Sequence, residues 1–129
     1  MATPPNDQPL YVAKAELFRA LGHPARIRIL ELLVDHDQQV SQLLDQMDLE
    51  PSSLSQHLAV LKNTGLVEPS RKGNSVTYKV TDPSVGAFLL AARSVLASTL
   101  GRARATLEDL EGPSRSTSRA RNSRPSGRA

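Results

Sequence analysis

The chain has 129 residues, with 16 Lys and Arg against 13 Asp and Glu, and it contains no Cys, no Trp and four Phe and Tyr together. This length suits one domain with a modest core, and the lack of Cys excludes disulfide bonds, thiolate metal ligands and a Cys nucleophile. No apolar run approaches the roughly 20 residues that a membrane helix needs, and the polar N-terminal residues lack a signal-peptide pattern, so we expect a soluble, cytoplasmic protein with no membrane partner.

Positive charge is concentrated at the C-terminal end of the chain. Residues 112–129 hold five Arg and no acidic residue, whereas residues 1–111 hold 11 basic and 13 acidic residues. The net charge therefore comes from the tail and is poor evidence for a nucleic-acid partner. Composition predicts a loose leader over residues 1–9, a folded domain over residues 10–111 and a disordered Ser- and Arg-rich tail, for which a sequence-blind DNA-binding arm is the alternative.

Helical spacing of apolar residues predicts three helices in the first part of the chain. The first covers residues 10–21 and the second about residues 25–35, because Gly-His-Pro at 22–24 stops one helix and starts the next, with Pro24 favoured in a first turn. A short third helix is expected over residues 40–47, with Ser41 as its N-cap.

A narrow apolar stripe predicts a fourth helix over Ser52–Asn63. Leu54, Leu58 and Leu61 fall within about 60° on a helical wheel, and Gly65 is a suitable C-terminal stop. The opposite face contains no acidic residue and holds Ser52, Gln56, Ala59, Val60 and Asn63, with Ser53 and Ser55 beside it.

The apolar period then changes from 3.6 to 2, which is typical of strands. Residues 66–68 and 76–80 alternate, and Arg-Lys-Gly-Asn at 71–74 favours a turn, so we expect a hairpin with a basic tip. A last helix over residues 82–111 carries an apolar stripe that Gly101 could interrupt. That stripe would protrude from so small a domain, and a second copy of the chain is its simplest partner.

This order of elements describes a mainly α fold with a two-stranded β-wing, a winged helix-turn-helix, which places its second helix in the DNA major groove. Short polar side chains can read base edges there, while cations of the wing suit the phosphate backbone. Asp48 and Glu50, near the start of the helix, count against this interpretation because they repel phosphate. The expected DNA-binding residues are Ser52, Ser53, Ser55, Gln56, His57, Lys62, Arg71, Lys72 and Asn74.

Several segments together resemble the ArsR/SmtB family of repressors over roughly residues 10–110. These segments are Ala-Leu-Gly-His-Pro-Ala-Arg-Ile-Arg-Ile-Leu at 20–30, Ser-Ser-Leu-Ser-Gln-His-Leu at 52–58 with Leu61 and Gly-Leu-Val at 65–67, and Arg-Lys-Gly-Asn at 71–74 with Tyr78. The resemblance implies base contacts at Ser52, Ser55 and Gln56, an inverted-repeat operator, and a homodimer joined by the first and last helices. At that interface we expect Leu10, Phe18, Phe88, Ala92, Val95, Leu96 and Leu100.

The chain departs from the family at both of its familiar sensor sites. Many relatives carry a Cys-x-Cys pair where this sequence has Val40–Leu44, and the last helix has Asp82 near its start but no His. We therefore assign no metal ligand. The alternative is a regulator linked to Ni²⁺ or Zn²⁺ through His and Asp ligands, such as His36 between two Asp residues, or through a sensor partner protein.

The two remaining histidines each allow two interpretations. His23 precedes Pro24 at a helix start, where capping is favoured over metal binding. His57 points nearer the leucine face of its helix than the open face, which favours packing over a DNA contact.

Enzyme classes find no support in the sequence. It contains no Gly-rich phosphate loop, no Ser elbow and no carboxylate pair placed with a nucleophile. A winged-helix module for protein–protein contact is the remote alternative, but the open face of residues 52–63 lacks the aromatic or Arg anchors of such surfaces. We expect a transcriptional regulator, a repressor, that binds double-stranded operator DNA as a homodimer.

Overall fold

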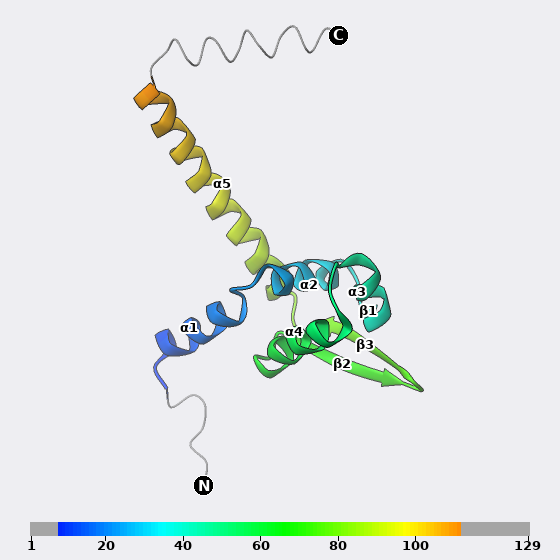
Figure 1. Cartoon of the computed structure of the whole chain (residues 1–129). Coiled ribbons are helices and arrows are strands. Elements are labelled where there is room, and N and C mark those ends of the chain that lie inside the picture. The colour runs from blue at the N-terminus through cyan, green and yellow to red at the C-terminus, as the bar shows by residue number, and fades with distance from the viewer. Residues whose placement is uncertain (1–7, 112–129) are drawn as a thin grey trace, which may run out of the picture. The chain divides into compact units, whose positions relative to one another are not determined.

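The computed structural model describes residues 8–111, and Figure 1 labels their elements. The chain divides into two compact units, one up to Leu89 and one from Leu90 onward. The predicted tail and most of the predicted leader lie outside the described residues.

The described residues form helices and strands in the order that the sequence predicts, with one added strand. The elements are α1 (Leu10–Ala20), α2 (Pro24–Asp35), β1 (Gln38–Gln39), α3 (Val40–Gln46), α4 (Pro51–Asn63), β2 (Val67–Lys72), β3 (Ser75–Val80) and α5 (Ser84–Glu111). The winged helix-turn-helix class is thereby confirmed, with α3 and α4 as the helix-turn-helix and β2 and β3 as the wing.

His23 sets the start of α2. Its backbone is extended, and its Nδ1 accepts a hydrogen bond from the N–H of Ala25 at 3.0 Å. Pro24 occupies the first turn, where its missing N–H is not needed. The capping interpretation of His23 is confirmed.

The core of the first unit consists mainly of leucine. Each fully buried leucine or isoleucine stabilises the fold by about 1.5–3 kcal/mol, so the packing of α2, α3 and α4 against one another fixes the position of α4. The least exposed apolar side chains are Ile29, Leu30 and Leu33 of α2, Leu43 of α3, Leu54, Leu58 and Leu61 of α4, and Val67 of β2.

The predicted two-stranded wing is confirmed as β2 and β3, and a strand that was not predicted, β1, extends its sheet. This strand pairs antiparallel with β3, with Gln38 opposite Tyr78 and Gln39 opposite Thr77, which gives a sheet of order β1-β3-β2. Two residues are too few to show the alternation by which a strand is recognised, so the pattern could not reveal it.

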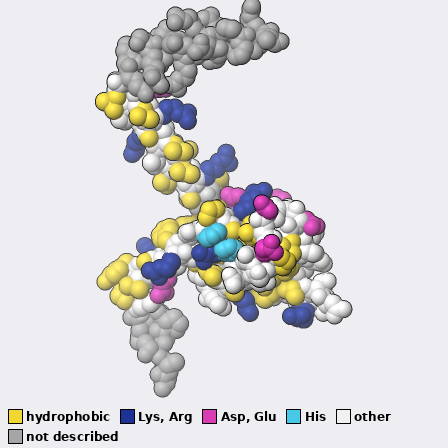
Figure 2. Space-filling view, in the orientation of Figure 1, with side chains coloured by type: hydrophobic (Ala, Val, Ile, Leu, Met, Phe, Trp, Pro, Cys, Tyr) yellow, Lys and Arg dark blue, Asp and Glu magenta, His cyan; other side chains and the backbone are white. Residues whose placement is uncertain are grey.

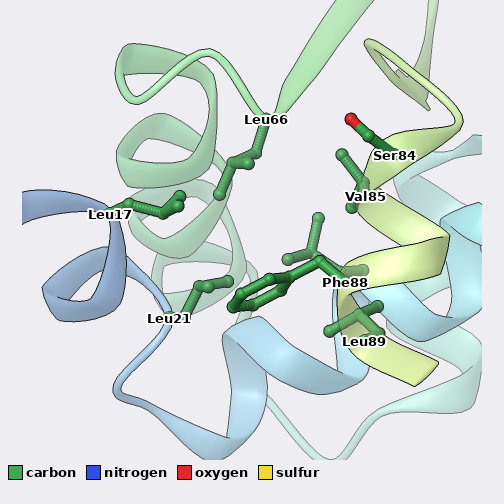
Figure 3. Close-up of a pocket in the computed structure, with 8 residues that line it drawn as sticks. Leu17, Leu21, Leu66, Ser84, Val85, Phe88 and Leu89 are labelled. Atoms are coloured by element: carbon green, nitrogen blue, oxygen red, sulfur yellow. The ribbon is translucent and has the colours of Figure 1, made fainter. Parts of the chain in front are cut away.

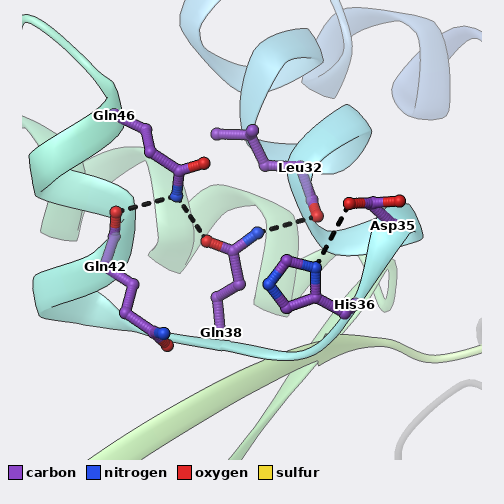
Figure 4. Close-up of polar contacts among 6 residues, drawn as sticks. All are labelled: Leu32, Asp35, His36, Gln38, Gln42 and Gln46. Carbon is purple, nitrogen blue, oxygen red and sulfur yellow. Dashed lines mark hydrogen bonds and ion pairs between the residues drawn. The ribbon is translucent and has the colours of Figure 1, made fainter.

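Gln38 is a buried polar side chain at the junction of α2, β1 and α3 (Figure 4). Its Nε2 donates to the carbonyl oxygen of Leu32 at 2.9 Å, and its Oε1 accepts from Nε2 of Gln46, which also donates to the carbonyl oxygen of Gln42. A buried amide is costly unless it is hydrogen-bonded, and both ends of this amide have partners. The network ties β1 to the end of α2 and to α3.

The predicted N-cap of α3 is wrong. Because β1 runs directly into α3, the cap position falls on Gln39, and Ser41 lies within the first turn. Oε1 of Gln42 accepts the backbone N–H of Gln39 at 2.7 Å, as the third residue of a capping box does.

The wing is longer than expected, and its turn is tighter. Arg71 and Lys72 belong to β2 rather than to the turn, which consists of Gly73 and Asn74. Gly73 has a φ of 61°, a conformation that a two-residue hairpin turn requires and that glycine adopts without steric cost.

Helix α5 continues through Gly101 without a break, so the interruption considered from the sequence does not occur. By length and composition alone, its segment Ser84–Leu110 could cross a membrane, and the expectation that no apolar run approaches that length is wrong. Arg93 is the only charged residue between Ser84 and Gly101, because Ala, Ser, Thr and Gly fill the places between the large apolar side chains.

Candidate nucleic-acid interface

Helix α4 has one buried face and one exposed face, as its helical wheel predicts. Leu54, Leu58 and Leu61 are at most 2% exposed. The exposed positions of the helix include Ser52, Ser55, Gln56, Ala59 and Asn63. This face presents hydroxyl and amide groups on short side chains, which can donate to and accept from base edges.

The two flanks of α4 differ in their surroundings. Ser53 and His57 are half-buried, whereas Lys62 is exposed. His57 and Lys62 lie about 140° apart around the helix at 100° per residue. A helix in the major groove has a sugar-phosphate backbone on either side. On such a helix, a cationic side chain on either flank can contact a phosphate.

The first turn of α4 has unpaired backbone donors. Pro51 is its first residue, and the N-cap Glu50 makes no side-chain hydrogen bond to it. The first turn contains no acidic residue, so its N–H groups and the positive end of the helix dipole favour an anion. The exposed carboxylate of Glu50 opposes that effect.

The wing presents two cations near its tip. Arg71, Lys72 and Asn74 are all exposed. Within residues 8–111, neither Arg71 nor Lys72 takes part in a salt bridge, whereas Lys79 pairs with Glu68 on the neighbouring strand at 3.5 Å. The charge of Arg71 and Lys72 is therefore available for a phosphate, and that of Lys79 is partly neutralised.

His57 contacts the start of α2 through His23. The two ring centroids lie 4.4 Å apart with the planes tilted by 48°, and Figure 2 shows imidazoles gathered in one patch on the visible face. Burial, together with the charges of His23 and Arg26, lowers the pKa of His57 below its ordinary value. His57 thus has the packing role that its position on the wheel favours, while its half-burial leaves part of the ring accessible.

Comparison with known proteins identifies the family. A family described as bacterial regulatory protein, arsR family, matches residues 23–69. The HTH-type transcriptional regulator Rv0081 of Mycobacterium tuberculosis, itself described as uncharacterized, is 50% identical over 104 residues, which are 80% of this chain and 91% of that protein. The chain belongs to the arsR family of regulatory proteins.

The structure of Rv0081 agrees with this assignment. The crystal structure of Rv0081 matches the structure of this chain with a TM-score of 0.69 and 49% sequence identity. The match covers 74% of this chain and 96% of the Rv0081 chain. Two further relatives are the transcriptional repressor SmtB of M. tuberculosis, 35% identical over 70% of this chain and 66% of that protein, and the transcriptional activator HlyU of Vibrio cholerae, 34% identical over 57% and 68%. The arsR-family protein is therefore a transcriptional regulator with a helix-turn-helix.

The residues expected at a dimer interface of this arsR-family chain fall in two groups. In the first unit, Phe18 of α1 contacts Phe88 of α5 with ring centroids 5.7 Å apart. Leu10 is exposed at the start of α1. In the second unit, the exposed side chains are Ala92, Val95, Leu96 and Leu100.

An apolar cavity of about 240 Å³ lies between α1 and the start of α5 (Figure 3). Leu17 of α1 and Leu21, which follows α1, face Val85 and Phe88 of α5 across it. Ser84 supplies the hydroxyl among its lining side chains. Phe18 and Phe88 also contact each other, so apolar side chains join α1 to the start of α5.

Metal ligands do not converge in the described part of this arsR-family chain. Residues 8–111 contain no group of three or more His, Cys, Asp and Glu side chains that could hold a metal ion. His36 contacts Asp35 at 3.2 Å, and both are exposed. Oδ1 of Asp82 instead accepts the N–H of Ser84 at 2.8 Å at the start of α5.

Sequence reasoning missed one side chain near α4. Arg26 has an Nε atom that is buried without a hydrogen-bond partner in the described part of the chain. The contact of His57 with His23 was missed as well, because 34 positions separate the two residues and no local pattern reports such a pairing.

Proposed function

We propose that this protein is a cytoplasmic, homodimeric, non-enzymatic repressor that binds an inverted-repeat operator through α4 and the wing. The observation that carries the proposal is the exposed face of α4, which presents Ser52, Ser55 and Gln56 and contains no acidic residue. Gln can pair with both adenine atoms of the major groove edge, and Ser can bond several bases. Ser53, His57 and Lys62 flank this face.

Contacts to the DNA backbone are assigned to the wing. Arg71 and Lys72 are exposed and without a salt bridge in the described part of the chain, and Asn74 lies in the turn between their strand and the next. These residues position the protein on the duplex, while α4 reads its sequence.

The dimer is assigned to α1 and α5. A helix with an exposed apolar stripe is stabilised when a second copy covers that stripe, and Val95, Leu96 and Leu100 are each more than half exposed in the single chain. Helix pairing between two copies also accounts for the apolar length of α5 without a membrane. Leu10, Phe18, Phe88 and Ala92 complete the proposed interface.

Footprinting of the purified protein on its own promoter region tests this function. We expect protection of two half-sites whose centres lie about 34–36 Å apart, one helical turn of DNA. In a reporter assay we expect repression rather than activation. The relative SmtB is named a repressor, whereas the relative HlyU is named an activator. Protein that ignores every duplex offered at low salt would refute the proposal.

The same footprint tests the metal-linked alternative. The protected region is compared in Ni²⁺, in Zn²⁺ and in chelator. A change with one metal would assign a sensing function to ligands such as His36 and its Asp neighbours or to a shared site in the dimer. Indifference to all three conditions would favour control by a sensor partner protein.

A further inference from the structure

His23, Arg26 and His57 form a cluster between the start of α2 and one flank of α4. The imidazole centroids of His23 and His57 lie 4.4 Å apart, and Nε of Arg26 is buried without a partner among residues 8–111. None of the salt bridges in this part of the chain involves these three side chains. The cluster thus combines three nitrogen-bearing groups with no ion-paired carboxylate.

The groups that the cluster leaves free are hydrogen-bond donors. Nδ1 of His23 accepts a hydrogen bond from the N–H of Ala25, so the proton of the neutral ring is assigned to Nε2. Nε2 lies on the side of the ring away from the start of α2. Arg26 has five N–H donors and no acceptor, and His57 has one donor when neutral and two when protonated. The buried Nε of Arg26 is unfavourable without an acceptor, whereas His23 is exposed and His57 half-buried. An oxyanion supplies several acceptor oxygens at once.

The charges around His57 point to the same kind of ligand. Burial lowers the pKa of His57, and His23 at the N-cap of α2 and Arg26 in α2 lower it further. On α4 itself, Lys62 lies on the opposite flank. A bound anion would oppose the positive charge of Arg26, so binding an anion and protonating His57 favour each other.

We propose that His23, Arg26 and His57 form a binding site for a phosphate oxyanion. Its place on the molecule favours a phosphate of the DNA backbone, because His57 lies on the flank of the helix that we assign to the major groove. This choice of source rests on the proposed function, whereas the oxyanion site itself does not. A free phosphate compound offers the same chemistry, and the experiment separates the two sources.

In the first arm, the full-length protein with isotope-labelled histidine is titrated with inorganic phosphate in the absence of DNA. Chloride keeps the ionic strength constant, and the resonances of the imidazole rings are followed by NMR. We expect saturable shifts at His23 and His57 and a higher pKa for His57. His36, which lies at the other end of α2 beside Asp35, is the internal control and should not respond. No saturable shift, or an equal shift at His36, would overturn the proposal.

The second arm repeats the phosphate titration with two matched variants on α2. R26Q should lose the response, whereas R28Q should keep it, because Arg28 is exposed and already pairs with Glu31 at 3.2 Å. If R26Q is misfolded, R26K replaces it, and weaker phosphate binding is expected because the planar fork is lost. A full response in the folded Arg26 variant would contradict the assignment.

The third arm identifies the source with a duplex that the wild-type protein binds. If a DNA phosphate occupies the site, the duplex shifts His23 and His57, and R26Q lowers the slope of log affinity against log salt by about one unit. If only inorganic phosphate shifts these resonances, the site takes a free phosphate compound. Wild-type DNA binding is scored separately, so failure of the proposed function and failure of the oxyanion site give different results.

Discussion

Gln56 lies on the exposed face of α4 beside Ser52 and Ser55, and its side chain is the longest uncharged polar group of the three. An amide can pair with two atoms of one adenine, whereas a hydroxyl can accept or donate to several bases. At the scale of single residues, we therefore expect Gln56 to carry more base discrimination than its neighbours.

Replacing Gln56 by Ala should relax the preference at one base pair in each half-site, at a cost of about 1–3 kcal/mol. Competition between duplexes substituted at single positions measures this effect. Gln8→Ala, which removes the same amide from a residue ahead of the helices, should leave the preference unchanged. Equal loss of affinity for all duplexes would contradict a base-reading role.

Gln38→Leu should destabilise the fold. The carbonyl oxygen of Leu32 would lose its donor, and an unpaired group of this kind costs about 1–3 kcal/mol when buried. The amide of Gln46 would lose one acceptor but keep the carbonyl oxygen of Gln42. Urea unfolding followed by circular dichroism measures the change. Gln8→Leu provides the control, since Gln8 is exposed ahead of the helices and takes no part in these hydrogen bonds.

At the scale of elements, the wing and α4 have separate tasks. Arg71 stands next to the tip of β2, exposed and away from the ion pair that Lys79 makes with Glu68. A cation in this position can contact phosphate, which is the same in every sequence.

Arg71→Ala should weaken binding to all duplexes by a similar factor and reduce the salt slope by about one unit. Titrations at several salt concentrations, with specific and unrelated duplexes, measure both effects. Lys79→Ala is the matched control, because its charge is already paired. A loss confined to one sequence would show that Arg71 reads bases.

Helices could be predicted from the sequence because their apolar spacing is local. The three leucines of α4, the stop at Gly65 and the start of α2 at Pro24 all follow from residues within a few positions of one another. β1 could not be predicted, because a two-residue strand exists only through its pairing with β3. The misplaced N-cap of α3 follows from that omission.

The candidate site was predictable to the same extent. The helical wheel of α4 predicts that Ser52, Ser55 and Gln56 point outward, and all three are exposed in the structure. The contact between His23 and His57 depends on how α2 packs on α4, and Arg26 has no sequence signal that separates it from an ordinary surface arginine. Long-range packing, rather than composition, brings this cluster together.

At the scale of the whole molecule, DNA binding and dimer formation should be coupled. Two half-sites can be occupied together only if two copies are joined, and the proposed junction is the apolar stripe of α5. Leu96 is 57% exposed in the single chain and lies on that stripe.

Leu96→Glu should convert the dimer to a monomer and abolish operator protection, because it places two like charges in an apolar interface. Sedimentation equilibrium and the footprint measure the two effects. Ala97→Glu introduces the same charge about 120° away from the centre of the stripe and should preserve the dimer. A monomeric wild-type protein, or a dimeric Leu96→Glu variant, would refute the assigned interface.

The pairing of β1 with β3 limits how the hairpin can be exchanged between relatives. Because Gln38 and Gln39 hydrogen-bond to the strand that bears Tyr78, and Gln38 is also anchored to α2 and α3, the hairpin is not a detachable module. A chimera that imports only residues 67–80 would place foreign side chains against a resident glutamine network. Transplanting residues 38–46 together with the hairpin should give a better-folded chimera than transplanting the hairpin alone.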